Sequence, residues 1–420
     1  MDDGGAMGSL IPPTLVQPLT WTIVALALAG VIVRPGRWPE WIWAVAGAVA
    51  LVAGGLLPAP RAWAGVRRGT DVYLFLAGMM LLAEVARQEG VFDWFAAHAT
   101  RAARGSATRL FDLVYLLGVL TTVFLSNDAT AVVLTPAVAA MARTARARAP
   151  LPHLLACAFV ANAASFLLPI SNPANLVVYG GRPPALGAWL AQYGVAAVAA
   201  ILVTWAGLRG LERRALRLGL RSAEVPPLRL GRGGRWAALG IGLAAAGLLT
   251  CSALGQRLGP PSLALGAAVA LGCALRARRS PWGLVRRVSW GVLPLVGGLF
   301  VLVTALEHTG AIAALAALLR AVPAAGAGAG MAVLCNLANN LPVGLIGGAA
   351  VQGAGTDLSG AVLVGIDLGP NLSVTGSLAT LLWLAALRRE GIAVSAGAFL
   401  RRGAVLMPVA LAAALAGLLL

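Results

Sequence analysis

The sequence predicts an all-α polytopic membrane protein. Of its 420 residues, 59% are hydrophobic and only 11% are charged, whereas a soluble domain carries about 25% charged residues. Apolar segments recur along the whole chain, and 187–208 and 403–420 reach the ~20 residues that a spanning helix needs. Other apolar segments are shorter or are cut by Asn, Pro and Gly. We therefore expect about ten full spans, with the short pieces left as half-helices and re-entrant hairpins.

The charged residues also favour a membrane protein. The formal net charge is +17, which in a soluble protein would suggest nucleic acid as a partner. Here the arginines lie in short runs between apolar segments, a pattern typical of cytoplasmic loops. We therefore expect a lipid bilayer around the chain and no nucleic acid. The first 33 residues contain no Lys or Arg, so no cleaved signal peptide is expected.

The cysteines and histidines give no sign of a cofactor or an enzyme. The four cysteines have no metal-type spacing and are expected to pack as small apolar residues. The three histidines are far apart and form no HExxH pattern. An intramembrane enzyme would need a metal cluster or a nucleophile with its base, so we expect a transporter with no cofactor. These residues are Cys157, Cys251, Cys273, Cys335, His98, His153 and His308.

A basic stretch divides the chain into two parts. Residues 209–235 hold eight arginines against Glu212 and Glu224, together with Pro226-Pro227. Such a run is typical of a solvated cytoplasmic linker. The predicted organisation is therefore an N-terminal half at 1–208, with leading transmembrane helices, this basic linker, and a C-terminal half at 236–420.

The two halves resemble each other in where polar residues interrupt apolar sequence. The first half has Leu125-Ser-Asn-Asp128 and then Ile170-Ser-Asn-Pro-Ala-Asn175. The second half has Leu337-Ala-Asn-Asn340 and then Asp367-Leu-Gly-Pro-Asn371. Paired interruptions at corresponding positions of two halves indicate the binding site of a secondary transporter.

The interruption that begins at Ser126 shows why these positions predict a site. A charged residue such as Asp128 costs roughly 2.5–3.5 kcal/mol within the hydrocarbon, and Ser, Asn and Asp favour caps over helix interiors. Non-helical backbone at membrane depth is tolerated only where it is buried in protein or lines a wet cavity. We therefore expect a helix break at 126–130 that forms half of a substrate site.

Four stretches give the chain its resemblance to a known family. They are Leu125–Thr130, Asn339–Pro342, Gly365–Asn371 and Gly376–Trp383. Through them the chain resembles the ArsB-type arsenite efflux permeases of the ion transporter (ArsB/NhaD) superfamily. The resemblance implies two inverted repeats, each with a re-entrant helix hairpin and a broken transmembrane helix. The halves are not equivalent, because Ala338 stands where the first half has Ser126.

The same resemblance implies an activity and partners. It implies export of arsenite or antimonite in exchange for protons across the cytoplasmic (inner) membrane of a bacterium or archaeon. In some organisms such a permease docks to a soluble ArsA-type ATPase. The sequence does not set an oligomeric state.

Amides and hydroxyls at the breaks are the candidate substrate-binding groups. Arsenite near neutral pH resembles a neutral trihydroxy acid, so its recognition calls for hydrogen bonds rather than charge pairing. The alternative is that each asparagine only caps a broken helix. The candidates are Ser126, Asn127, Thr130, Ser171, Asn172, Asn175, Asn339, Asn340, Asn371, Thr375 and Ser377.

Two carboxyls are candidates for proton coupling. Asp128 is the first choice and Asp367 the second, because burial favours the neutral form of a carboxyl and lets it load and release a proton. The alternative for either is a structural hydrogen bond. Cys335 is a candidate soft ligand for trivalent arsenic. Two competing functions also stay open within the superfamily, namely sodium/proton antiport and organic-anion symport.

Overall fold

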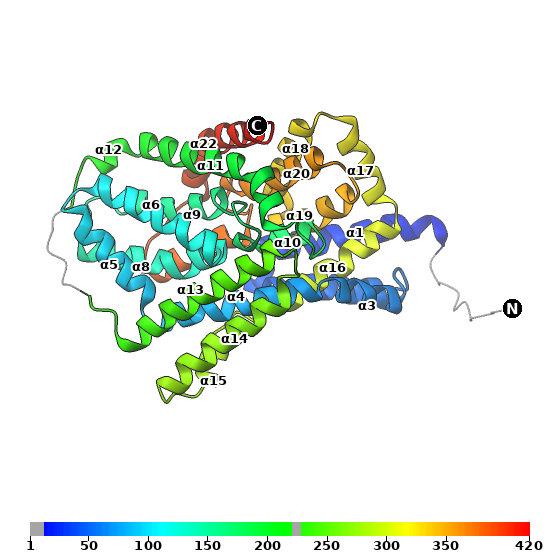
Figure 1. The fold of residues 1–420 in the computed structure, drawn as a ribbon. Coiled ribbons are helices and arrows are strands. Elements are labelled where there is room, and N and C mark those ends of the chain that lie inside the picture. Colours follow the sequence, from blue (N-terminus) through cyan, green and yellow to red (C-terminus); the bar gives the residue numbers. More distant parts are fainter. Residues whose placement is uncertain (1–11, 221–227) are drawn as a thin grey trace. The chain divides into compact units, whose positions relative to one another are not determined.

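The computed structural model describes residues 12–220 and 228–420, and every regular element in these ranges is helical (Figure 1). The chain forms two compact units, Met1–Thr70 with Trp290–Leu318, and Asp71–Ser289 with Leu319–Leu420. The predicted linker residues 221–227, which include Arg221, Glu224, Pro226 and Pro227, lie outside the described part. Helices occupy both ends of the predicted linker, so its described residues are mostly helical.

The first unit is a small helical bundle. Its helices pack in the pairs α1 with α2, α2 with α16, and α3 with α16. Arg68 at the end of α3 forms an ion pair of 2.7 Å with Glu307 at the end of α16, and Arg61 contacts His308 beside it. The bounds are α1 (Pro13–Val33), α2 (Glu40–Ala53), α3 (Ala59–Arg68) and α16 (Val292–His308), with the 3₁₀ turn η1 (Pro35–Arg37).

The second unit begins with the helices of the first half. A helix is interrupted at 125–126, a second one is interrupted between 164 and 172, and a long helix follows. The bounds are α4 (Thr70–Gln88), α5 (Val91–Ala103), α6 (Ala107–Phe124), α7 (Asn127–Ala129), the π turn η2 (Thr130–Leu134), α8 (Thr135–Thr144), α9 (Leu151–Ala163), η3 (Pro169–Ser171), α10 (Pro173–Val178) and α11 (Leu186–Leu211).

The second half repeats this order after four connecting helices of the described part of the chain. A helix is interrupted at Asn339, a second one between 369 and 377, and a long helix again follows. The connecting elements are α12 (Arg213–Leu216), α13 (Arg232–Ala253), α14 (Gly259–Arg276) and α15 (Trp282–Val285). The second half continues with α17 (Ala311–Ala321), α18 (Ala324–Ala338), α19 (Asn340–Val351), α20 (Thr356–Leu368), η4 (Gly369–Asn371), α21 (Leu378–Arg389) and α22 (Ala396–Gly417).

The helix ends follow from local sequence rules. Asn172 begins α10 by accepting a hydrogen bond from the Ala174 amide at 3.0 Å, with Pro173 at the first helical position. Ser377 begins α21 in the same way by accepting from the Thr380 amide at 3.0 Å. The polar residues that interrupt the apolar sequence therefore end one helix and begin the next.

The lengths of the helices agree with the predicted number of spans. Within the described ranges, five helices are long and apolar enough to cross a membrane, namely α1, α6, α11, α13 and α22. Two helix pairs, α3 with α4 and α16 with α17, qualify as single interrupted spans. Adding α2 and the two broken helices, α9–α10 and α20–α21, gives about ten crossings. The predicted all-helical, two-repeat fold with breaks and about ten spans is therefore confirmed.

Two packed pairs hold the broken helices of the second half in place. The long helices α11 and α22 lie side by side (Figure 1), and α18 packs against α20 through glycines. A Cβ atom at Gly365 would lie 2.1 Å from the carbonyl oxygen of Gly328, a distance that real Cβ atoms do not tolerate. Gly365 thus allows the backbones of α18 and α20 to touch, two residues before Asp367.

Candidate functional site

The broken helices of the two halves meet at Asp367. Its side chain is fully buried at the end of α20. The Ser165 hydroxyl donates to Asp367 Oδ2 at 2.7 Å, and the Asn172 side-chain amide donates to Asp367 Oδ1 at 2.9 Å. Ser165 and Asn172 flank the break between α9 and α10. The first half therefore satisfies both oxygens of a carboxyl that the second half supplies.

A second bridge between the halves runs through Asn162 near the end of α9. Its Nδ2 donates to Asn371 Oδ1 at 3.0 Å and lies 3.4 Å from Thr380 Oγ1. Asn371 Nδ2 donates in turn to the Phe159 carbonyl oxygen at 3.1 Å. Thr380 Oγ1 is 2.9 Å from Ser377 Oγ. Because Ser165 Oγ also lies 2.8 Å from the Asn162 carbonyl oxygen, the contacts of Asn162 and those of Asp367 form one network, in which the single Ser165 proton is shared between two acceptors.

We call this the broken-helix network. It joins α9, α10, η4, α20 and α21, and its members are Asn162, Ser165, Asn172, Asp367, Asn371, Ser377 and Thr380.

Two amide oxygens at the network have no donor. Asn162 Oδ1 and Asn175 Oδ1 are buried and accept no hydrogen bond from the described residues. Asn175 Nδ2 donates to the carbonyl oxygens of Ser165 at 2.8 Å and Leu168 at 3.2 Å, which fixes the interrupted backbone. A buried acceptor without a donor costs roughly 1–3 kcal/mol. A hydroxyl donor or a bare cation that reached these oxygens would therefore be stabilised there.

The first-half interruption at 125–130, which we call the first tip, is stabilised by hydrogen bonds of its own side chains. Ser126 Oγ accepts from the Ala129 amide at 3.1 Å, and Asn127 Oδ1 accepts from the Asp128 amide at 2.9 Å. Thr130 Oγ1 lies 2.8 Å from Thr122 Oγ1 across the break. Short polar side chains of this kind supply the hydrogen bonds that a broken helix lacks.

Asp128 differs from its neighbours because its carboxylate accepts no hydrogen bond from any described residue, although the side chain is half-buried. It lies on α7, and α7 and η2 both pack against α21. Ser377 and Thr380 of the network lie at the start of α21. The tip of the first half therefore lies beside the second half, with its carboxyl group still available.

The second-half interruption at 339–340, which we call the second tip, forms hydrogen bonds with the break between η4 and α21 in the same half. Asn339 has φ +69° and begins α19 by accepting from the Leu341 amide at 3.4 Å. Its Nδ2 donates to the Thr375 carbonyl oxygen at 3.3 Å, and the Asn340 amide donates to the Gly376 carbonyl oxygen at 2.8 Å. In the first half the corresponding tie is Ser171 Oγ, which donates to the Val123 carbonyl oxygen at 3.2 Å.

Cys335 is isolated from other soft ligands. It is fully buried, and its thiol donates to the Ile366 carbonyl oxygen at 3.6 Å, next to Asp367. Within residues 12–220 and 228–420, no group of three or more His, Cys, Asp or Glu side chains is placed to hold a metal ion. A role for Cys335 as a ligand therefore stays a prediction, and a single thiol would have to carry it.

The structure brings the predicted residues together in three places. Asn172, Asp367, Asn371 and Ser377 belong to the network, and Asn175 and Ser171 hold the backbone beside it. Ser126, Asn127 and Thr130 fix the first tip, while Asn339, Asn340 and Thr375 fix the second. Many of these contacts are helix caps, which agrees with the alternative that the asparagines only cap broken helices. That any of these residues binds a substrate stays a prediction.

Sequence reasoning missed four side chains. Asn162 and Ser165 lie in a segment that reads as continuous apolar sequence, and Thr380 lies in a helix after the last interruption. Asn336 donates to the Gly369 carbonyl oxygen at 2.9 Å and accepts from the Ser373 hydroxyl at 2.7 Å. The available signal was polarity alone, because an Asn within an apolar helix must find a partner inside the protein.

Comparison with known proteins agrees with this architecture. The arsenical pump membrane protein of Escherichia coli (strain K12) is 28% identical over an alignment of 428 positions, gaps included. The alignment covers 93% of this chain and 96% of that protein. An uncharacterized transporter of Mycobacterium tuberculosis is 26% identical over 370 residues, covering 82% and 84% of the two chains.

The fold also has a solved relative. The crystal structure of the YdaH transporter of Alcanivorax borkumensis, described as having an unusual topology, has a TM-score of 0.59 and 17% sequence identity. The similarity covers 96% of this chain and 97% of that one, and it supports the fold alone. The model of the citrate transporter family, CitMHS, matches residues 23–387. Because this match covers most of the sequence, the chain belongs to the CitMHS citrate transporter family of multi-pass membrane transporters.

Proposed function

We propose that this chain exports arsenite and antimonite from the cytoplasm of a bacterium or archaeon in exchange for protons across the inner membrane. The observation that carries the proposal is the broken-helix network, a buried set of amides and hydroxyls. Asn162 Oδ1 in the network and Asn175 Oδ1 beside it accept no hydrogen bond from the described residues. The relatives named arsenical pump membrane proteins support this choice of substrate.

The chemistry of the network favours a neutral substrate rich in hydroxyl groups. Arsenous acid carries three O–H donors, which match the free oxygens of Asn162 and Asn175. Recognition of a multiply charged organic acid would call for guanidinium groups in bidentate contact. Among the described residues, no arginine forms a hydrogen bond with a member of the network. We therefore favour arsenite over an organic anion such as citrate.

Asp128 is the proposed coupling group. A neutral substrate does not respond to the membrane potential, so its export against a gradient needs a charge that moves in exchange. One proton that enters through ~150 mV supplies about 3.5 kcal/mol, which corresponds to a gradient of several hundredfold. Asp128 carries a carboxyl without an internal hydrogen bond, whereas Asp367 is already satisfied by Ser165 and Asn172.

Sodium/proton antiport is the second candidate, and the same two oxygens favour it. Amide oxygens and freed backbone carbonyl groups also coordinate small cations. Asn162 Oδ1 and Asn175 Oδ1 lie next to an interrupted backbone. Under this alternative the network would bind sodium, and Asp128 would still carry the proton.

The deciding experiment is arsenite uptake into everted membrane vesicles. We expect the wild type to accumulate arsenite, a protonophore to abolish the accumulation, and Asp128→Asn to lose it. The matched control is Asp357→Asn, which removes an exposed carboxyl at the start of α20. Indifference to arsenite together with dissipation of a sodium gradient would replace the proposal with sodium/proton antiport. Uptake that persists in Asp128→Asn would remove Asp128 from the mechanism.

A further inference from the structure

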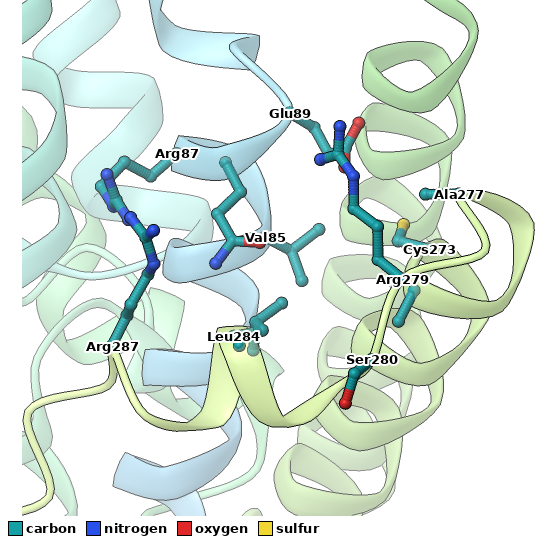
Figure 2. Close-up of a pocket in the computed structure, with 12 residues that line it drawn as sticks. Val85, Arg87, Glu89, Cys273, Ala277, Arg279, Ser280, Leu284 and Arg287 are labelled. Carbon is teal, nitrogen blue, oxygen red and sulfur yellow. The ribbon is translucent and has the colours of Figure 1, made fainter.

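A second polar site lies away from the network. A cavity of about 420 Å³ opens between the ends of α4 and α14 and the short helix α15 (Figure 2). Three guanidinium groups line it, from Arg87 on α4, Arg279 after α14 and Arg287 after α15. Gln88 and Ser280 add hydrogen-bonding groups. Arginines from three separate segments thus converge on one space.

The charges around this cavity are not balanced. Arg87 is paired with Glu84, at 2.7 and 2.6 Å. Arg279 and Arg287 form no ion pair within the described part of the chain. Figure 2 shows Arg287 pointing toward Arg87 and Arg279 reaching toward Glu89. Glu89 also lines the cavity, on the side of Arg279. On the other side Arg87 and Arg287 carry like charges, so an anion between these two guanidinium groups would be stabilised.

The cavity lies at the end of α14, near the start of α13, where the basic linker ends. Helices α13 and α14 pack together, and the Arg276 guanidinium at the end of α14 lies 3.7 Å from the ring centroid of Trp236 near the start of α13. Arg278, Arg279, Arg286 and Arg287 follow α14 closely, with no acidic residue among 276–289. An arginine-rich connection of this kind belongs to the cytoplasmic side of a membrane.

Apolar side chains continue outward from the same segments. Leu271 and Leu275 on α14 are 48% and 66% exposed, and Trp282 on α15 is 66% exposed. Exposed Leu on a spanning helix faces acyl chains, and Trp is typical of the membrane interface. These side chains flank the lining residues Cys273, Ala274 and Gly283 in sequence, and a soluble phosphate would make no use of them.

We propose that this cavity binds the phosphate headgroup of an anionic phospholipid from the cytoplasmic leaflet, with the acyl chains against Leu271, Leu275 and Trp282. Basic pockets between transmembrane helices on the cytoplasmic side recognise such headgroups. The proposal does not depend on the substrate that the network transports.

The test is native mass spectrometry of the full-length purified protein with phosphatidylglycerol, phosphatidylcholine or inorganic phosphate. We compare the wild type with Arg279→Gln/Arg287→Gln and with the single variant Arg287→Gln. The control is Arg286→Gln, which removes the same charge from the same loop but does not line the cavity. Each guanidinium near an anionic headgroup contributes a factor of about five in affinity, so the double variant should bind phosphatidylglycerol roughly 30-fold more weakly.

Support requires that phosphatidylglycerol is retained over phosphatidylcholine, that the control binds like the wild type, and that inorganic phosphate does not compete. Equal retention of the two lipids would overturn the proposal, as would an equal loss in Arg286→Gln. Competition by inorganic phosphate would instead assign the cavity to a soluble anion. If the double variant does not fold, the single variant Arg287→Gln decides. Its affinity for phosphatidylglycerol should fall fivefold, which corresponds to about 1 kcal/mol.

Discussion

The two carboxyls at the helix breaks, Asp128 and Asp367, have opposite surroundings. Asp128 follows the apolar helix α6, Asp367 lies at the end of the apolar helix α20, and each is close to an asparagine. Asp367 accepts hydrogen bonds from Ser165 and Asn172, which belong to the other half of the chain. Asp128 accepts none from the described residues, and only its backbone amide is engaged, by Asn127.

This difference separates two ways of placing an acid within a membrane protein. A carboxyl whose lone pairs are used inside the protein stabilises the fold, and removing it leaves buried donors unpaired. A carboxyl without internal partners contributes little to stability and remains free to exchange a proton. We therefore expect substitutions at the two positions to separate stability from transport. The predictions run from the largest expected loss of stability to the smallest.

Asp367→Leu is expected to give the largest loss. It leaves the Asn172 amide without an acceptor in a fully buried place and removes one of the two acceptors of the Ser165 hydroxyl, which keeps the Asn162 carbonyl oxygen. At about 1–3 kcal/mol for the unpaired amide and about 1 kcal/mol for the lost hydroxyl hydrogen bond, the free energy of unfolding should fall by roughly 2–4 kcal/mol. Thermal unfolding of the purified protein measures this. The control Asp357→Leu, at an exposed position, should change the midpoint little, and an unchanged midpoint for Asp367→Leu would refute the structural role.

Gly365→Ala tests the support of Asp367. The new methyl group would lie 2.1 Å from the Gly328 carbonyl oxygen, so α20 must move away from α18. Forced separation of this kind costs typically ~1–3 kcal/mol, and it should also displace Asp367 from its partners. Gly330→Ala, with open space around the added methyl group, is the matched control on α18. Equal unfolding midpoints for the two variants would contradict the close packing.

Asn162→Ala should destabilise less. It removes the donor to Asn371 at 3.0 Å and the weaker one to Thr380 at 3.4 Å, but it also removes the buried oxygen that lacks a donor. These effects oppose each other, so we expect a loss of about 1 kcal/mol. Arsenite uptake should fall more than this loss of stability explains. A variant with wild-type uptake would exclude Asn162 from the site.

Asp128→Asn is expected to change stability least, by under ~0.5 kcal/mol, because no internal hydrogen bond to the carboxylate is lost. Proton-coupled uptake should nevertheless disappear, since an amide cannot carry the proton. Thermal unfolding and vesicle uptake of the same preparation separate the two effects. If the unfolding midpoint of Asp128→Asn fell as far as that of Asp367→Leu, Asp128 would have a structural role. The two carboxyls would then not differ in the way proposed.

Much of this protein was determined by its sequence alone. Hydropathy predicted the membrane fold, and Asn, Pro and Gly in apolar segments predicted where helices end, because spanning length and capping depend on neighbouring residues only. The interruptions at 125–128, 337–340 and 367–371 fall at observed helix breaks. Membership of the family followed from the same motifs.

Only the tertiary structure decided which polar groups meet. Asn172 donates to Asp367 across 195 positions of the sequence, and Asn162 donates to Asn371 across 209. No periodicity encodes such pairs, which arise when the broken helices of the two halves pack together. For the same reason the sequence, which placed Asp128 first and Asp367 second for proton coupling, did not predict that their hydrogen-bond partners differ. Whether a buried carboxyl is satisfied or left free depends on donors that folding brings from the other half.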